Sequence, residues 1–156
     1  MESKTGLIPP SICAFLICLS IVVFKSFFSK KPVALSGTPA VRRLKTYSAQ
    51  SGYAYQYFYE GHRPFRSGGE SGTEFVFSIT ADRKNWHSTS VLLGDGAVGE
   101  WQAAHQRELS STEQYAIAKM SLFQAFDDRP LPAQMRDEVR VPNAAVETIM
   151  ETLDLE

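Results

Sequence analysis

Residues 7–28, LIPPSICAFLICLSIVVFKSFF, constrain this chain most, because no other stretch is long and apolar enough to leave water by itself. The part from Leu7 to Phe24 carries no charge. The twenty residues from Pro9 to Phe28 would span about 30 Å as a helix, which matches the hydrocarbon core of one bilayer. The sequence therefore predicts an N-terminal transmembrane anchor within residues 1–28.

A cleaved signal peptide is the competing interpretation of this stretch. Cleavage requires small residues at alternate positions soon after the apolar run, but Lys25, Phe27 and Phe28 stand there. The order of residues favours an anchor that stays attached. Both cysteines, Cys13 and Cys18, lie inside the apolar stretch, so the rest of the chain has neither a disulfide framework nor a thiolate cluster for zinc.

The charges are divided unevenly along the chain. Residues 1–45 carry seven Lys or Arg against the single acid Glu2, and the remainder carries nine against sixteen. Six cations flank the apolar stretch on its C-terminal side: Lys25, Lys30, Lys31, Arg42, Arg43 and Lys45. The positive-inside bias predicts a single-pass protein with its N-terminus outside and its C-terminal domain cytoplasmic. The basic flank suits anionic lipid headgroups of the bilayer, and the acidic remainder argues against nucleic acid as a partner.

The sequence after the anchor predicts a linker and one small domain. Residues 29–43 combine Pro, Gly and basic residues, which is typical of a linker. Residues 47–60 alternate and predict a strand, followed by a turn-rich, mobile loop over residues 61–72. Residues 73–80 and 86–93 predict two further antiparallel strands. We expect a domain of the α+β class over residues 44–128, with about three antiparallel strands packed by two helices.

The two helices follow Gly94 and Ser110. After Gly94 the apolar period changes to three and four residues, and Ser110 with Glu113 has the spacing of a capping box. Residues 129–156 predict a Pro-rich connector and an amphipathic C-terminal helix, with Asn143 as a candidate N-cap.

Gly94, Gly96 and Gly99 match the spacing of a dinucleotide fingerprint between a predicted strand and a helix. The fingerprint also needs a second parallel strand with an acid about twenty residues further on, but here a second helix follows. We interpret these glycines as a strand-to-helix turn. His62, His87 and His105 lack the spacing of metal ligands on one helix face, and no nucleophile elbow is present. The sequence predicts no catalytic residues, no metal and no cofactor.

Two groups of residues are the candidate interfaces. Aromatic faces are enriched where proteins meet and can also stack on small ligands, although a small sheet also buries one face in its core. The first group alternates on the first strand: Tyr53, Tyr55, Tyr57 and Tyr59. The second is the stripe of the C-terminal helix, which either docks on a partner or packs on its own domain: Val146, Ile149, Met150 and Leu153.

The favoured function is a membrane-tethered, non-enzymatic accessory or scaffolding subunit whose domain binds a protein partner within a membrane complex. One alternative is a domain on the exported side that binds a small ligand or an envelope polymer on its tyrosine face. A membrane-tethered enzyme is the third hypothesis.

Overall fold

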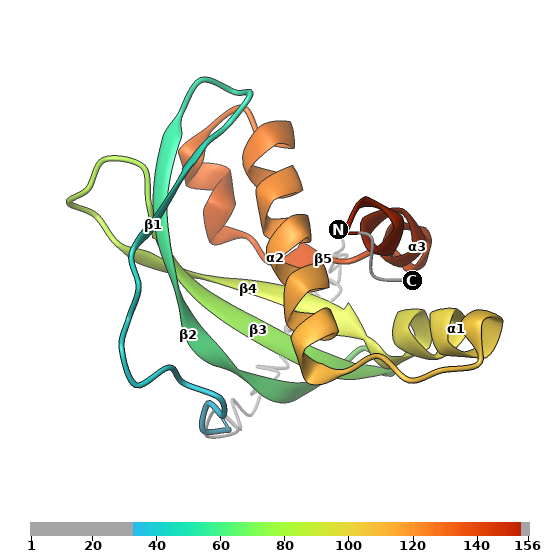
Figure 1. Ribbon diagram of the computed structural model, residues 1–156. Coiled ribbons are helices and arrows are strands. Elements are labelled where there is room, and N and C mark those ends of the chain that lie inside the picture. The colour runs from blue at the N-terminus through green and yellow to red at the C-terminus, as the bar shows by residue number, and fades with distance from the viewer. Residues whose placement is uncertain (1–32, 154–156) are drawn as a thin grey trace, which may run out of the picture. The chain divides into compact units, whose positions relative to one another are not determined.

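A curled sheet of five strands and three α-helices form the part of the chain that the computed structural model describes, residues 33–153 (Figure 1). In chain order the elements are β1 (Lys45–Ser48), β2 (Ala54–Ser67), β3 (Glu70–Thr80), β4 (His87–Gly94), α1 (Asp95–His105), α2 (Ser111–Asp128), the 3₁₀ helix η1 (Pro132–Arg136), β5 (Val139–Arg140) and α3 (Asn143–Thr152). The sheet order is β1-β2-β3-β4-β5, with β1 to β4 antiparallel and β5 parallel to β4. The predicted α+β class is confirmed.

The first predicted strand is a hairpin in the structure. The chain turns over residues 49–53, where the Ala49 N–H donates to the Tyr53 carbonyl oxygen at 2.9 Å. Tyr47 of β1 then pairs directly with Tyr55 of β2. Residues opposite each other in an antiparallel pair point to the same face, so the alternating tyrosine pattern continues across the turn. Alternation alone could not reveal the break, and the expected number of about three strands was too low.

The prediction of a mobile loop over residues 61–72 is wrong, because β2 continues to Ser67 and β3 begins at Glu70. Only Gly68 and Gly69 form the turn, with φ of 60° and 85°. Two-residue hairpin turns require such positive φ values, which glycine adopts without strain. Pro64 is tolerated because, among the described residues, no strand pairs with the outer side of β2 there.

The segment before β1, residues 33–44, which we call the strap, is bonded to β2 at His62, next to a bulge between Tyr59 and Gly61. The strap is drawn in blue in Figure 1 and runs alongside β2. The Ser36 N–H donates to the His62 carbonyl oxygen at 2.7 Å, and the His62 N–H donates back at 2.9 Å. Gly61 has φ of 143°, and a Cβ there would lie 2.8 Å from the Ser36 carbonyl oxygen. The residue therefore allows both the bulge and the close approach of the strap.

The core lies between the concave face of the sheet and α2, around which the sheet curls (Figure 1). The capping box predicted at the start of α2 is present: the Ser110 hydroxyl accepts from the Glu113 N–H, and the Glu113 carboxylate accepts from the Ser110 N–H. Ile117, Leu122 and Phe126 of α2 are fully buried against the sheet.

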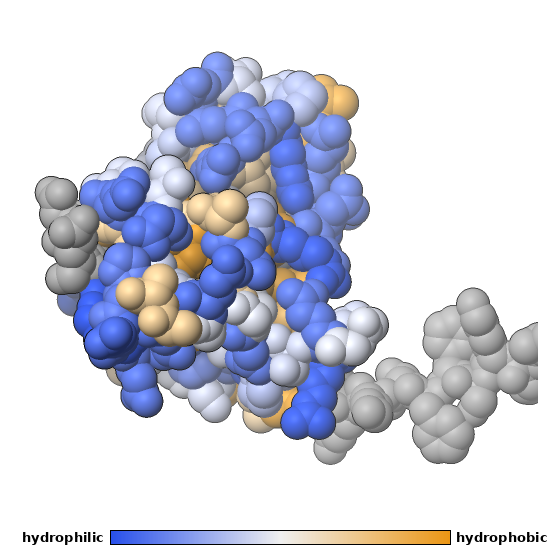
Figure 2. Space-filling model, turned by 90° about the vertical axis from the view of Figure 1, so that its right-hand side faces the viewer, coloured by the Kyte–Doolittle hydropathy of each residue, from blue (hydrophilic) through white to orange (hydrophobic). Residues whose placement is uncertain are grey.

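Residues 129–153 pack on the same core and sheet, which is one of the two interpretations of the C-terminal helix that the sequence left open. β5 adds to the sheet beside β4, and α3 follows with its N-cap at Pro142. Val146, Ile149 and Met150 are buried in the common core. The surface that carries α1 and α3 is mostly hydrophilic, with small separate apolar patches (Figure 2).

The described residues belong to one compact unit. Among residues 33–153, none of the helices has the length and apolar character needed to cross a membrane. The predicted anchor and Lys25, Lys30 and Lys31 of its basic flank lie outside the described residues and stay predictions.

Candidate ligand-binding cavity

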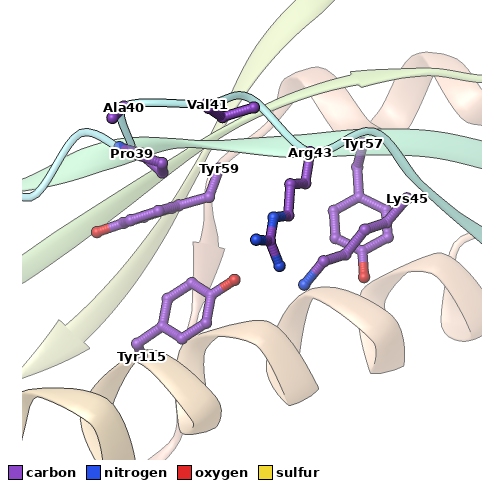
Figure 3. A pocket seen from close by; sticks show the side chains of 8 residues that line it. All are labelled: Pro39, Ala40, Val41, Arg43, Lys45, Tyr57, Tyr59 and Tyr115. Carbon is purple, nitrogen blue, oxygen red and sulfur yellow. The ribbon is translucent and has the colours of Figure 1, made fainter.

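A cavity of about 510 Å³ lies between the strap, the first two strands and α2 (Figure 3). In Figure 3 the Arg43 and Lys45 side chains point from the strap and β1 toward α2, and Tyr115 points back from α2 toward them. Such a volume falls within the range of about 300 to 1,000 Å³ that is usual for small-molecule sites. The cavity is lined by Pro39, Ala40, Val41, Arg43, Lys45, Tyr57, Tyr59 and Tyr115.

The period of the strands places these side chains. Tyr57 and Tyr59 lie two residues apart on β2, so both point to the concave face. Lys45 pairs directly with Tyr57 across the β1–β2 ladder and therefore shares that face. Arg43, two residues before Lys45, also lines the cavity. The adjacent Arg42 points to the opposite face, where its guanidinium lies 3.1 Å from the Glu60 carboxylate.

Arg43 and Lys45 bring positive charge to the cavity, and the described residues that line it include no carboxylate. Arg43 and Lys45 make no ion pair or hydrogen bond with any residue in the range 33–153, in contrast to Arg42. Lys119 of α2 lies over the Phe123 ring, 5.4 Å from its centroid. Burial lowers the pKa of Lys119, and the nearby charge of Lys45 lowers it further. Lys119 is not part of the cavity lining, but an anion bound at Arg43 and Lys45 would offset the repulsion between Lys45 and Lys119.

Three phenol rings supply neutral hydrogen-bonding groups. The Tyr59 hydroxyl and the His62 Nδ1 share a hydrogen bond of 2.9 Å, whereas the hydroxyls of Tyr57 and Tyr115 make none within the described part of the chain. Burial, with a smaller contribution from Tyr115, raises the pKa of Tyr57 and of Tyr59 to about 12, and burial also raises the pKa of Tyr115. At neutral pH these phenols are protonated donors.

The raised tyrosine pKa values predict a loss of stability in alkali. Phenols ionise near pH 10 in the unfolded chain and near 12 at Tyr57 and Tyr59 in the fold, so the unfolded state loses its protons first. The contribution of these two phenols to the free energy of unfolding is fully present below pH 10 and is lost as the pH rises to 12. Urea unfolding across this range is expected to show a Tyr57→Phe variant with a shallower fall, by up to about 1.4 kcal/mol per pH unit. If the variant's stability fell with pH as steeply as that of the unmodified protein, the raised pKa of Tyr57 would be contradicted.

The structure separates the four tyrosines that the sequence grouped together. Tyr53 precedes β2 and is 38% exposed, whereas Tyr55 is fully buried and stacks on Phe126 with ring centroids 4.1 Å apart. Tyr57 and Tyr59 line the cavity. The stripe on α3 packs into the core with Leu153 at its margin, which is the second of the two interpretations left open by the sequence.

The other candidate residues are dispersed. His62 contacts Tyr59, while His105 binds Glu147 at 2.9 Å, and His87 lies on β4. Within residues 33–153 no three His, Cys, Asp or Glu residues are grouped so that they could hold a metal ion. Gly94 is the N-cap of α1, and Gly96 and Gly99 on that helix face open space rather than a closely packed strand. A strand parallel to β4 does follow, but it is β5, which has two residues and comes after both α1 and α2. The dinucleotide fingerprint belongs to a strand–helix–strand unit with a single helix between its two strands.

The chain matches no family model, no curated protein and no solved structure.

Sequence reasoning missed the partners that turn the tyrosine strand into a cavity. Tyr115 looked like one apolar position among many on a helix that is buried on several sides, and residues 39–41 looked like part of a linker. The one usable signal was the pair Arg43 and Lys45. Their spacing of two residues matches a strand and predicts that both share one face, which in the structure is the face of Tyr57 and Tyr59.

Proposed function

We propose that this chain is a membrane-tethered binding protein whose domain holds a small anionic ligand in the tyrosine-lined cavity. The observation that carries the proposal is the pair Arg43 and Lys45, which point into the cavity beside two phenol hydroxyls without any acidic partner among the described residues. Guanidinium and ammonium groups form charge-assisted hydrogen bonds with carboxylate and phosphate oxygens, and these are stronger than neutral ones. The basic flank keeps the cytoplasmic side as the proposed location of the domain.

The burial of the candidate interfaces favours a ligand over a protein partner. Tyr55, Val146 and Met150 are each at most 2% exposed, so they stabilise the fold and offer no surface to another protein. Tyr57 is 3% exposed and Tyr59 is half-buried, but both rings border a hollow of ligand size. The hypothesis of a small ligand on the tyrosine face is thus better supported than that of a scaffolding subunit.

A protein partner is the second proposal, and it rests on the convex face of the sheet. Trp86 is 41% exposed, and its ring lies 5.2 Å from that of Phe58, over which the Arg42 guanidinium is placed. Tryptophan and arginine are enriched in protein interfaces. This patch becomes the stronger candidate if the cavity binds nothing.

Thermal unfolding of the full chain in lipid nanodiscs tests the ligand proposal. Benzoate and inorganic phosphate are expected to raise the melting temperature, while benzyl alcohol, the neutral analogue of benzoate, is not. At a ligand concentration of about 100 times Kd the gain is about 2.7 kcal/mol, which is on the order of 10 °C for a domain of this size. Sodium chloride at equal ionic strength controls for screening. Equal shifts with benzyl alcohol and benzoate, or none with any anion, would overturn the proposal.

A further inference from the structure

The cavity has two chemically different halves. Pro39, Ala40 and Val41 of the strap and the ring of Tyr59 offer apolar surface on one side, where Figure 3 shows the strap above the Tyr59 ring. Arg43, Lys45 and the hydroxyls of Tyr57 and Tyr115, which have no hydrogen-bond partner among residues 33–153, offer charge and hydrogen-bond donors on the other. A ligand that matches both halves has an anionic end and an apolar end.

The size of the cavity also favours a ligand with both an anionic and an apolar end. A water molecule takes about 30 Å³ of liquid volume, so a cavity of about 510 Å³ is far larger than one phosphate or carboxylate group. A lone anion would leave the surface of Pro39, Val41 and Tyr59 in contact with water. An apolar chain or ring attached to the anion would cover that surface and gain its hydrophobic free energy.

The cavity lies close in sequence to the predicted anchor, which makes membrane lipid one candidate source of this ligand. The predicted anchor ends at Phe28, and the eleven residues from there to Pro39 can span at most about 40 Å. A bilayer is therefore within reach of the strap if the anchor is inserted.

We propose that the cavity takes an amphiphilic anion, with a carboxylate or phosphate head at Arg43 and Lys45 and an apolar body between Tyr59 and the strap. This inference rests on the proposed function and names its ligand class. Membrane lipids and soluble acids with an alkyl or aryl body share this chemistry, and the test distinguishes them.

The test is a ligand series on the full chain in phosphatidylcholine nanodiscs, followed by NMR of labelled tyrosine rings. The probes are acetate, butyrate, hexanoate and octanoate, with octanol as the neutral counterpart. Affinity at the Tyr57, Tyr59 and Tyr115 signals is expected to rise about three- to fourfold per methylene group, the upper value following from full burial. Octanol is expected to leave these signals unchanged. A Val41→Thr variant, similar in shape but more polar, is expected to weaken octanoate while acetate binding stays the same.

Three results separate the outcomes. If acetate binds as tightly as octanoate, the amphiphile inference is overturned while the anion site of the proposed function stands. If none of the anions shifts the three tyrosine signals, both fail. Adding phosphatidic acid to the nanodiscs tells the sources apart: shifts with both phosphatidic acid and octanoate support a membrane amphiphile, and shifts with octanoate alone support a soluble one.

Discussion

Replacing Arg43 and Lys45 together by glutamine is expected to weaken anion binding about a hundredfold. Both side chains point into the cavity, and each hydrogen bond to a charged group contributes about 1.5 to 3 kcal/mol, or roughly tenfold or more in Kd. Glutamine keeps much of the length and a hydrogen-bond donor but loses the charge. Calorimetric titration with benzoate measures the effect. The fold is expected to survive, because neither side chain makes an ion pair with another described residue.

Arg42→Gln is the matched control, since it removes the same charge from the adjacent residue. Arg42 binds Glu60 and lies over Phe58 on the opposite face of the sheet, so it does not reach the cavity. We expect less than a twofold change in Kd and a stability loss of at most about 1 kcal/mol. If Arg42→Gln weakened binding as much as the double variant did, general attraction by the basic segment would replace the cavity as the explanation.

Replacing Phe126 by alanine is expected to cost about 3 to 5 kcal/mol of unfolding free energy. The ring is fully buried, stacks on Tyr55 at 4.1 Å and lies 5.7 Å from the ring of Tyr47. Its removal opens a cavity where α2 meets the first two strands, and α2 also positions Tyr115. Since domains of this size are stable by about 5 to 15 kcal/mol, much of the total is lost. Urea unfolding followed by near-ultraviolet circular dichroism measures it.

Phe58→Ala deletes the same atoms from the convex face of the sheet. Phe58 is half-buried beside Trp86, so a smaller loss, about 1 kcal/mol, is expected. Equal losses in the two variants would show that α2 does not form the centre of the core.

Local patterns predicted much of this fold because they are written in a few neighbouring residues. The capping box at Ser110 and Glu113 and the strands near residues 73–80 and 86–93 were found in this way. The β1–β2 turn was missed because tyrosines face the same side before and after it. The strand at residues 61–67 was missed because Gly61 and Pro64 are typical of loops. A bulge accommodates Gly61, and Pro64 lies where no described strand pairs with the outer side of β2.

The cavity depends on contacts between distant segments, which sequence patterns do not encode. Tyr59 and Tyr115 lie 56 positions apart in the chain but 4.8 Å apart between ring centroids. The burial of α3 follows from β5, a strand of two residues that is too short to leave a periodic signal. Residues 33–44 have the composition of a linker, yet the Ser36–His62 bridge places them over the tyrosines.

Intermolecular nuclear Overhauser effects between bound benzoate and the tyrosine rings would show whether the anion binds in the cavity. We expect contacts from benzoate to ring protons of Tyr57, Tyr59 and Tyr115, and the loss of these contacts in the variant with both Arg43→Gln and Lys45→Gln. Contacts to Trp86 or Tyr53 in place of these three rings, or contacts that persist unchanged in that variant, would contradict binding in the cavity.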